Sequence, residues 1–189
     1  SGAGQGIGAR TAEVLAEAGA IVIVTGRTDA PCTAVVERIR AAGHQAHFRH
    51  LDVTQEEDWK SVMDDVCAKF GGLDVLVNNA GIYQGGTLES NTLEDGRRVH
   101  RVNVDSIFLG MKYAAQAMKP GGAAGRGGSI VNLSSVAGLI GVPGHTAYGS
   151  TKGAVRLYSR HAAVEFGALG YGIRVNSVHP GGVATPMVL

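Results

Sequence analysis

Residues 1–8 read Ser1-Gly2-Ala3-Gly4-Gln5-Gly6-Ile7-Gly8, a glycine-rich turn that leads into a predicted helix over residues 9–18. Glycines let a backbone approach a bound pyrophosphate closely, and the N-terminus of the helix offers unpaired N–H groups and a partial positive charge. An apolar run over residues 20–24 follows, as expected for a buried parallel strand. The order of turn, helix and strand predicts a phosphate-binding site; for the glycines alone, an ordinary tight turn is the alternative.

The rest of the chain alternates short apolar runs with longer helical patterns. Strands are predicted over residues 45–51, 74–77, 129–133 and 173–178, and helices over residues 31–42, 54–70, 93–118 (in two pieces) and 147–166. Such alternation implies right-handed crossovers and an α/β fold, a three-layer doubly wound parallel sheet with helices on both faces. Ligands of such sheets bind beyond the carboxyl ends of the strands, and the polar and glycine clusters of this chain fall there.

Composition limits the classes of protein that fit. The 189 residues suggest one domain, and the apolar fraction of 44% suffices for a sizeable core. The net charge of +1 argues against a nucleic acid or a membrane surface as the main partner. The two cysteines, Cys32 and Cys67, lack CxxC spacing, which indicates free thiols in a reducing compartment and favours a cytoplasmic location. No apolar run approaches the ~20 residues of a membrane-spanning helix.

The segment after the predicted strand over residues 20–24 bears on the choice of cofactor. A carboxylate at the end of this strand would accept hydrogen bonds from an adenosine ribose 2′-hydroxyl, but Gly26 takes that position and Arg27 follows. A guanidinium suits a 2′-phosphate, so the sequence favours NADP over NAD; a solvated arginine is the alternative. Asp52 and Val53 follow the next strand and are suited to contact an adenine, although Asp52 also fits an ordinary turn.

Three residues carry the predicted chemistry: Ser135, Tyr148 and Lys152. Tyr148 and Lys152 are four residues apart on a predicted helix and therefore share one face. An adjacent ammonium, together with a positive nicotinamide ring, would lower the pKa of Tyr148 from its usual value near ~10. Tyr148 could then exchange a proton with an alcohol or carbonyl oxygen, and Ser135, just after a strand, could orient that oxygen.

Together these motifs resemble the short-chain dehydrogenase/reductase family. The matching stretches are SGAGQGIG, LDV, NNAG, RVNVDSIFLG, IVNLSS, YGSTK and VNSVHPGGVATP, which span nearly the whole chain in the family's order. HLDVTQEEDW and IRVNSVHPG are most similar to bacterial hydroxysteroid and cyclic-alcohol dehydrogenases. The resemblance implies a Rossmann fold in a single domain over residues 1–189. Because the family's first strand, its C-terminal lid and its last strand have no counterpart, we expect a chain truncated at both ends, and no measurable activity if this piece were the whole protein.

The resemblance also implies roles for individual residues. Asn103 would hold a water that links Lys152 to solvent, and spacing to Tyr148 selects Ser135 rather than Ser134 as the catalytic serine. Tyr148 and Lys152 would also contact the nicotinamide end. The other residues expected at the cofactor are Gly2, Gly4, Gln5, Gly6, Ile7 and Gly8 at the pyrophosphate; Arg27, Asp52, Val53, Asn79, Ala80 and Gly81 at the adenosine; and Pro180, Gly181, Val183 and Thr185 at the nicotinamide carboxamide.

The sequence therefore predicts an oxidoreductase that moves a hydride between NAD(P)(H) and a small secondary alcohol or ketone. Alternatives are a 3-oxoacyl-thioester reductase of the same family, a nucleotide-binding protein without catalysis, and a sugar-nucleotide epimerase or dehydratase. The helices over residues 104–118 and 147–166 resemble those of the family's dimer interface, so a homo-oligomer, a dimer or tetramer, is expected. No metal is expected, because His47 would point opposite to His44 and His50 on a strand.

Three further residues are candidates for substrate contact. Tyr83 and Gln84 come just after the Asn-Asn-Ala-Gly turn, and His145 precedes Tyr148 by three residues. For each of them, a solvated loop position is the alternative.

Overall fold

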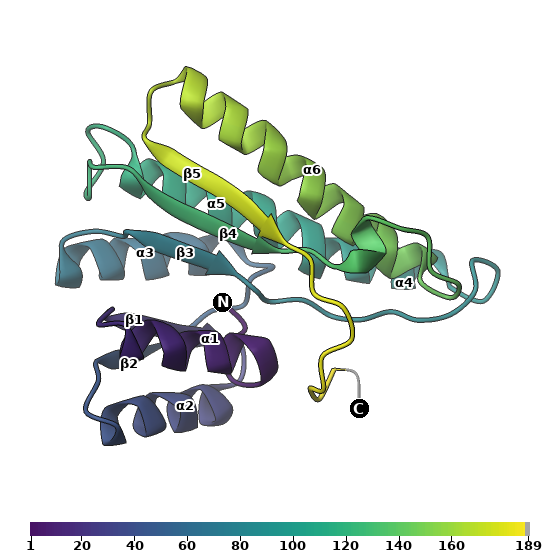
Figure 1. Ribbon diagram of the computed structural model, residues 1–189, viewed down its shortest axis with the longest axis horizontal. Coiled ribbons are helices and arrows are strands. Elements are labelled where there is room, and N and C mark those ends of the chain that lie inside the picture. Colours follow the sequence, from purple (N-terminus) through teal and green to yellow (C-terminus); the bar gives the residue numbers. More distant parts are fainter. Residues whose placement is uncertain (188–189) are drawn as a thin grey trace.

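The structure, a computed structural model, describes residues 1–187 and alternates helices with strands along the chain (Figure 1). The elements are α1 (Gly6–Glu17), β1 (Val22–Gly26), α2 (Asp29–Ala41), β2 (Ala46–His50), α3 (Glu56–Phe70), β3 (Val75–Asn78), α4 (Leu93–His100), a π-helical turn η1 (Arg101–Asp105), α5 (Ser106–Met118), β4 (Gly128–Leu133), a 3₁₀ turn η2 (Val136–Gly138), α6 (Thr146–Ala168) and β5 (Ile173–Val178).

All the paired strands run parallel, as the alternating pattern predicted. β1 pairs with β2, with Val22 opposite Ala46. β4 lies between β3 and β5, and Ile130 at its centre faces Leu76 on one side and Val175 on the other. The strand order β2–β1 and β3–β4–β5 is that of a doubly wound sheet with one position open between β1 and β3.

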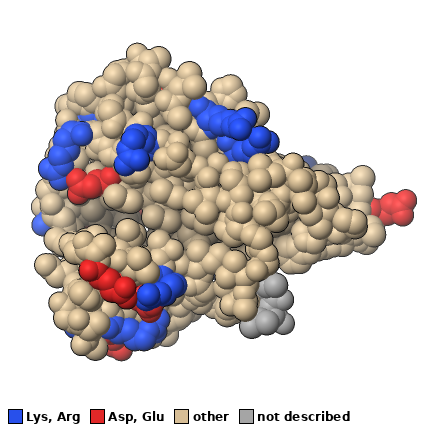
Figure 2. Space-filling view, viewed as in Figure 1, with Lys and Arg blue, Asp and Glu red and all other residues tan. Residues whose placement is uncertain are grey.

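The open position is a slot of about 370 Å³ lined mostly by apolar side chains of the flanking elements. Figure 2 shows a hollow between the two halves of the molecule on this face. Residues 1–3 close one end of the slot: the amino group of Ser1 donates to the carbonyl of Val77 (2.7 Å), and the N–H of Ala3 donates to the carbonyl of Thr25 (3.0 Å). The carboxyl ends of β1 and β3 therefore meet at the glycine-rich turn.

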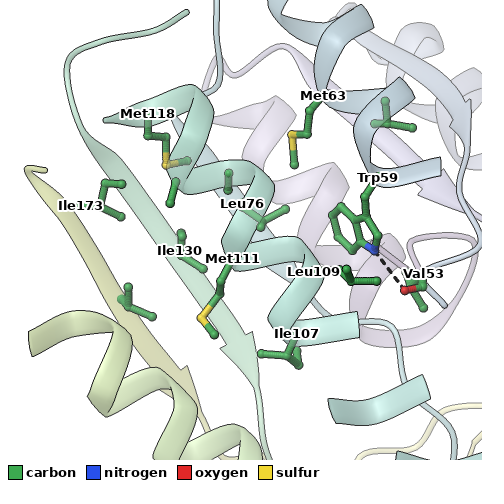
Figure 3. Packing of buried hydrophobic residues seen from close by; sticks show 14 of the residues in the cluster. Val53, Trp59, Met63, Leu76, Ile107, Leu109, Met111, Met118, Ile130 and Ile173 are labelled. Atoms are coloured by element: carbon green, nitrogen blue, oxygen red, sulfur yellow. Dashed lines mark hydrogen bonds between the residues drawn. The ribbon is translucent and has the colours of Figure 1, made fainter. Parts of the chain in front are cut away.

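The larger core packs α3 and α5 against β3 and β4 around Trp59, which is only 1% exposed (Figure 3). The Trp59 indole N–H donates to the carbonyl of Val53 (3.0 Å), which satisfies the only polar group of this side chain. α5 approaches β3 and α3 closely at Gly110, where a Cβ atom would collide with the Asn78 amide of β3 and lie 2.9 Å from the Trp59 ring of α3. A second core, centred on Val24 and Val35, joins α1 and α2 to β1 and β2.

Local hydrogen bonds explain where the observed elements depart from the predicted bounds. β1 starts two residues later than predicted, because the N–H of Ala20 still bonds to the carbonyl of Leu15 at the end of α1. Thr54 does not cap α3; its N–H and hydroxyl both donate to the carboxylate of Asp52 (3.0 and 2.8 Å), so the helix starts after Gln55. In residues 1–187, no helix combines the length and apolar character needed to cross a membrane.

Candidate active site

The backbone of the glycine-rich turn lines one end of a cleft. Gly2 and Gly6 have φ of 61° and 54°, a region that favours glycine, and α1 starts at Gly6. A Cβ at Gly2 would lie 2.7 Å from the Cα of Ala80, so this position has no room for a side chain. Gly8 lies beneath the turn instead, since its Cβ would come within 2.5 Å of the Gly2 carbonyl oxygen. Gly8 thus supports the turn and does not line the cleft.

The cleft has a volume of about 520 Å³ and runs from the glycine-rich turn past the carboxyl ends of β1, β2 and β3. Of the predicted cofactor residues it is lined by Gly2, Gly4, Gln5, Gly6, Ile7, Arg27, Asp52, Val53, Asn79, Ala80, Gly81 and Thr185. Sequence reasoning missed Cys32 and Val102, which also line it. They reach the cleft from α2 and η1, and no local pattern marks them in the sequence.

At the end of the cleft near Arg27, position 26 is a glycine and offers no carboxylate. A Cβ on Gly26 would lie 2.6 Å from the Cys32 sulfur, so a side chain there would have to displace that sulfur. Arg27 lines the cleft at this end. Asp52 lies across from it; burial alone would raise its pKa, but hydrogen bonds from the Thr54 N–H and hydroxyl outweigh burial and lower it.

Two asparagines at the carboxyl end of β3, Asn78 in the strand and Asn79 just after it, fasten this edge of the sheet. The Asn79 amide donates to the carbonyls of Ser1 (3.1 Å) and Gly2 (3.0 Å), which ties the loop after β3 to the glycine-rich turn. Asn78 is buried and donates to Asn132 on β4 (2.9 Å), and Asn132 donates to Ser159 on α6 (2.9 Å). This chain of bonds holds α6 in place over the two strands.

A second cavity, of about 100 Å³, adjoins the cleft and brings Ser135, Tyr148 and Lys152 together. It shares Ile7, Asn79, Gly81, Ile82, Thr185 and Met187 with the cleft, and Pro180, Gly181 and Val183 also line it. Pro180, Gly181 and Val183 lie on the segment after β5, which descends in front of the sheet toward α1 (Figure 1). Thr185 there reaches Gly6, whose Cβ would lie 3.2 Å from it.

The two neighbouring serines differ in what they bond. The Ser134 hydroxyl is buried and donates to the carbonyl of Lys152 (2.7 Å), which ties β4 to α6. The Ser135 hydroxyl accepts from the N–H of Ala137 (3.2 Å) and makes only a long contact with the carbonyl of Pro180 (3.5 Å). Ser135 is therefore the serine whose hydroxyl remains available to a molecule in the cavity.

Lys152 is buried, 5% exposed, and its ammonium donates to the carbonyl of Leu133 (2.7 Å). Burial lowers the pKa of Lys152 to about 8. Its nitrogen lies 5.7 Å from the centre of the Tyr148 ring. A Cβ at Gly81 would lie at an ordinary van der Waals distance, 3.5 Å, from this nitrogen and 3.2 Å from the Asn103 Oδ1.

The pKa of Tyr148 is raised above its usual value, contrary to the lowering predicted from sequence. Burial is the largest cause, and the negative charge that Tyr83 can carry adds to it, whereas the Ser135 hydroxyl acts in the opposite direction. The prediction invoked two cations, Lys152 and a nicotinamide ring. Lys152 directs its ammonium at the Leu133 carbonyl and does not by itself lower the pKa of the phenol.

Asn103 lies in η1, is 1% exposed, and lines neither cavity. Its Oδ1 accepts from the N–H of Ile82 (2.8 Å), and its Nδ2 donates to the carbonyl of Ile82 (2.9 Å) and to the Thr151 hydroxyl (3.1 Å). Thr151 in turn donates to the carbonyl of Tyr148 (2.7 Å). Both N–H groups of the Asn103 amide are thus engaged by protein atoms, and the amide has none to donate to the water that the family resemblance implied.

Of the three candidates for substrate contact, Tyr83 and His145 lie beside Tyr148. The centres of the Tyr83 and Tyr148 rings are 5.2 Å apart, and those of His145 and Tyr148 are 6.3 Å apart. Gln84 lies on the same loop, but its amide oxygen accepts from Arg98 and its nitrogen donates to the carbonyl of Gly85 (3.2 Å). Across residues 1–187, no group of three or more His, Cys, Asp or Glu side chains could hold a metal ion.

Comparison with known proteins gives these observations a context. Residues 1–189 match the family described as short chain dehydrogenase. Trans-4-hydroxycyclohexanecarboxylate dehydrogenase of Sinomonas cyclohexanicum is 42% identical, with 99% of this chain and 72% of that protein covered. Cyclopentanol dehydrogenase of Comamonas testosteroni is 41% identical, with the same coverage. The 3-alpha-(or 20-beta)-hydroxysteroid dehydrogenase of Mycobacterium tuberculosis is 42% identical over 99% of this chain and 68% of that protein.

A solved structure resembles the whole arrangement. Gluconate 5-dehydrogenase from Burkholderia cenocepacia, solved in complex with NADP and tartrate, is 32% identical to this chain with a TM-score of 0.87. The alignment covers 96% of this chain and 69% of the solved one. This similarity confirms the predicted α/β fold of the Rossmann type.

Proposed function

The chain belongs to the short-chain dehydrogenase family, as its sequence predicted, and on that premise we propose that it transfers a hydride between NADP(H) and a cyclic secondary alcohol or its ketone. The observation that carries the proposal is the convergence of Ser135, Tyr148 and Lys152 in one cavity that opens into the cleft. A cofactor in the cleft would place its reactive end beside these three side chains.

The residues around the cleft fit a nicotinamide dinucleotide. The volume of about 520 Å³ lies in the range of cofactor sites, ~300–1,000 Å³. The N-terminus of α1 at Gly6 suits a pyrophosphate, and glycine at positions 2 and 6 lets the backbone come close to it. When bound, the nicotinamide ring supplies or accepts the hydride.

The chain's own residues handle the proton and the orientation of the substrate. Ser135 donates a hydrogen bond to the reacting oxygen and positions it next to the Tyr148 hydroxyl. Tyr148 gives its proton to that oxygen during reduction and removes it during oxidation. The Leu133 carbonyl holds the Lys152 ammonium 5.7 Å from the centre of the Tyr148 ring, where, together with the positive charge of an oxidised nicotinamide ring, it would stabilise the phenolate that results.

The preference for NADP rests on Gly26 and Arg27. Glycine at position 26 supplies no carboxylate to bind a ribose 2′-hydroxyl, and a side chain there would have to displace the Cys32 sulfur. The Arg27 guanidinium, on the wall of the cleft, matches a 2′-phosphate. The NADP complex of the related gluconate 5-dehydrogenase is consistent with this assignment.

The cyclic substrate class rests on the relatives, whose names refer to cyclohexane, cyclopentane and steroid alcohols. A panel of cyclic alcohols, steroids, open-chain ketones and 3-oxoacyl thioesters, assayed with both cofactors in the full-length enzyme, tests it. We expect turnover of the cyclic compounds and better turnover with NADP(H). Activity confined to acyl thioesters would contradict the proposal and favour a 3-oxoacyl-thioester reductase.

We further propose that residues 1–189 form one nucleotide-binding domain of a cytoplasmic enzyme that assembles as a dimer or tetramer through α5 and α6. Large apolar side chains on these helices face outward, namely Phe108 (49% exposed), Leu157 (55%) and Val164 (74%). Light scattering should give a mass two or four times that of the monomer. A monomer at micromolar concentration would contradict the assembly and leave the chemistry untouched.

A further inference from the structure

Tyr83 touches the proposed acid–base residue but has no part in the mechanism above. Its ring meets the Tyr148 ring edge to face, with centres 5.2 Å apart and planes at 67°. It also lies 5.3 Å from the His145 ring. Edge-to-face aromatic pairs at this separation are favourable beyond their burial of area. Tyr83 is nevertheless 43% exposed, so one side of its ring faces solvent next to the cavity.

The loop that carries Tyr83 is fixed on both sides of it. Before it, the Asn103 amide bonds both the N–H and the carbonyl of Ile82 (2.8 and 2.9 Å). After it, the N–H of Gly86 donates to the carbonyl of Gly144 (3.0 Å), next to His145. These bonds join the loop to η1 on one side and to the segment before α6 on the other.

The Tyr83 ring folds back over Gly85. A Cβ at Gly85 would lie 2.8 Å from the Tyr83 hydroxyl oxygen and 3.0 Å from the ring. A side chain at position 85 would therefore have to displace the Tyr83 ring. Glycine at this position leaves room for the observed ring orientation.

His145 completes the cluster on the outer side. Its Nδ1 lies 2.9 Å from the carbonyl of Pro143, which can only accept, so this nitrogen carries a proton. In the neutral ring, Nε2 is then an acceptor, and it faces the Tyr83 hydroxyl at 3.4 Å. The Tyr83 hydroxyl can then donate its one proton to this nitrogen.

We propose that Tyr83 is a positioning residue, which holds the Tyr148 ring in its orientation, and that the two rings form a wall against which a ring-shaped substrate lies. The second part rests on the proposed function. A flat aromatic surface contacts a closed ring over a larger area than a flexible chain, and a closed ring has fewer rotatable bonds to order on binding.

The environment of Tyr148 agrees with this role. The polar or titratable groups near the phenol are Ser135, Lys152, Tyr83 and His145. Burial is the main cause of the raised pKa of Tyr148, and the Tyr83 ring covers one edge of the phenol. Removal of that ring would admit water and lower the pKa.

The first test reads Tyr148 directly and needs no turnover. Near-ultraviolet absorbance of tyrosinate is titrated in the full-length protein and in its Tyr83→Leu, Tyr83→Phe and Tyr158→Leu variants, each against the same protein with Tyr148→Phe. The difference reports Tyr148 alone. In Tyr83→Leu we expect Tyr148 to ionise about 1 pH unit lower, because water reaches the phenol. Tyr83→Phe, which keeps the ring, should shift it much less.

Tyr158→Leu is the matched control, because Tyr158 has a similar exposure (41%) and lies ten residues further along α6, about 15 Å away. It should leave the ionisation of Tyr148 unchanged. An unchanged Tyr148 midpoint in Tyr83→Leu, or an equal shift in Tyr158→Leu, would overturn the positioning role. This test decides that role even if the proposed reaction is wrong.

The second test compares cyclohexanol with 2-hexanol, two secondary alcohols with six carbons. The ratio of their kcat/KM values should fall about tenfold in Tyr83→Leu and stay near that of the wild type in Tyr83→Phe and Tyr158→Leu. Gly85→Ala, which displaces the ring without removing it, should reproduce the loss. An unchanged ratio in Tyr83→Leu would refute the wall, whereas no turnover of either alcohol by the wild type would refute the proposed function instead.

Discussion

At the scale of single residues, the chemistry depends on how buried groups are paired. Lys152 is surrounded by protein yet has only one hydrogen-bond acceptor, the Leu133 carbonyl. Its charged form is therefore penalised, and its pKa falls from 10.5 to about 8. A residue with this property costs stability to the fold, and such strongly shifted groups cluster at functional sites.

The cost of burying Lys152 predicts that the free energy of unfolding depends on pH. Between pH 8 and 10.5 the unfolded lysine holds a proton that the folded one has lost, so the free energy of unfolding rises with pH in that window. The rise from this group is at most about 3 kcal/mol. Urea unfolding of the wild type and of Lys152→Met as a function of pH measures it. Parallel curves for the two proteins would show that Lys152 titrates normally.

Arg27 provides a second prediction at this scale. Arg27→Ala removes the guanidinium from the wall of the cleft but leaves Gly26 and Cys32 in place. We expect kcat/KM for NADP(H) to fall at least about tenfold and that for NAD(H) to change by less than about twofold, because a charge-assisted contact to phosphate is lost. Steady-state kinetics with both cofactors checks this. An equal loss with both would assign Arg27 a structural role.

At the scale of helices and strands, the sequence predicted every strand, and all bounds of β5 were correct. Periodicity and β-branched runs suffice for buried parallel strands, but they do not show side-chain bonds that redirect the chain. Thr54 was expected to cap α3 and instead bonds Asp52. The helix over residues 93–118 lies in two pieces, α4 and α5, as predicted, and the π-helical turn η1 joins them. Asn103 in that turn was predicted at the site, but no sequence pattern indicates the hydrogen bonds of its amide to Ile82.

Glycine positions within helices test this packing. A Cβ at Gly110 in α5 would lie 2.9 Å from Trp59 and closer still to Asn78, so Gly110→Ala should destabilise the fold by about 1–3 kcal/mol. Gly96 in α4 has no atom within 4 Å of its would-be Cβ. Gly96→Ala should therefore stabilise by up to about 1 kcal/mol through helix propensity. Chemical denaturation of both variants measures these changes. Destabilisation of both by the same amount would contradict the close approach of α5 to β3.

At the scale of the whole molecule, two sheets share one edge where the site forms. The carboxyl ends of β1 and β3 meet at the glycine-rich turn, and α6 brings Tyr148 and Lys152 to the end of β4. The sequence predicted which residues gather at this edge because parallel strands end together. It did not predict that Gly8 supports the turn from below or that burial raises the pKa of Tyr148, since both depend on distances between segments far apart in the chain.

The central claim is that Tyr148 exchanges the proton while the cleft binds the cofactor independently of it. The most direct test measures kcat for cyclohexanol oxidation and the NADPH dissociation constant in full-length wild-type enzyme and in Tyr148→Phe. We predict that kcat falls by about 10³-fold or more while the dissociation constant changes less than about threefold. Turnover of Tyr148→Phe at a rate near that of the wild type would contradict the account.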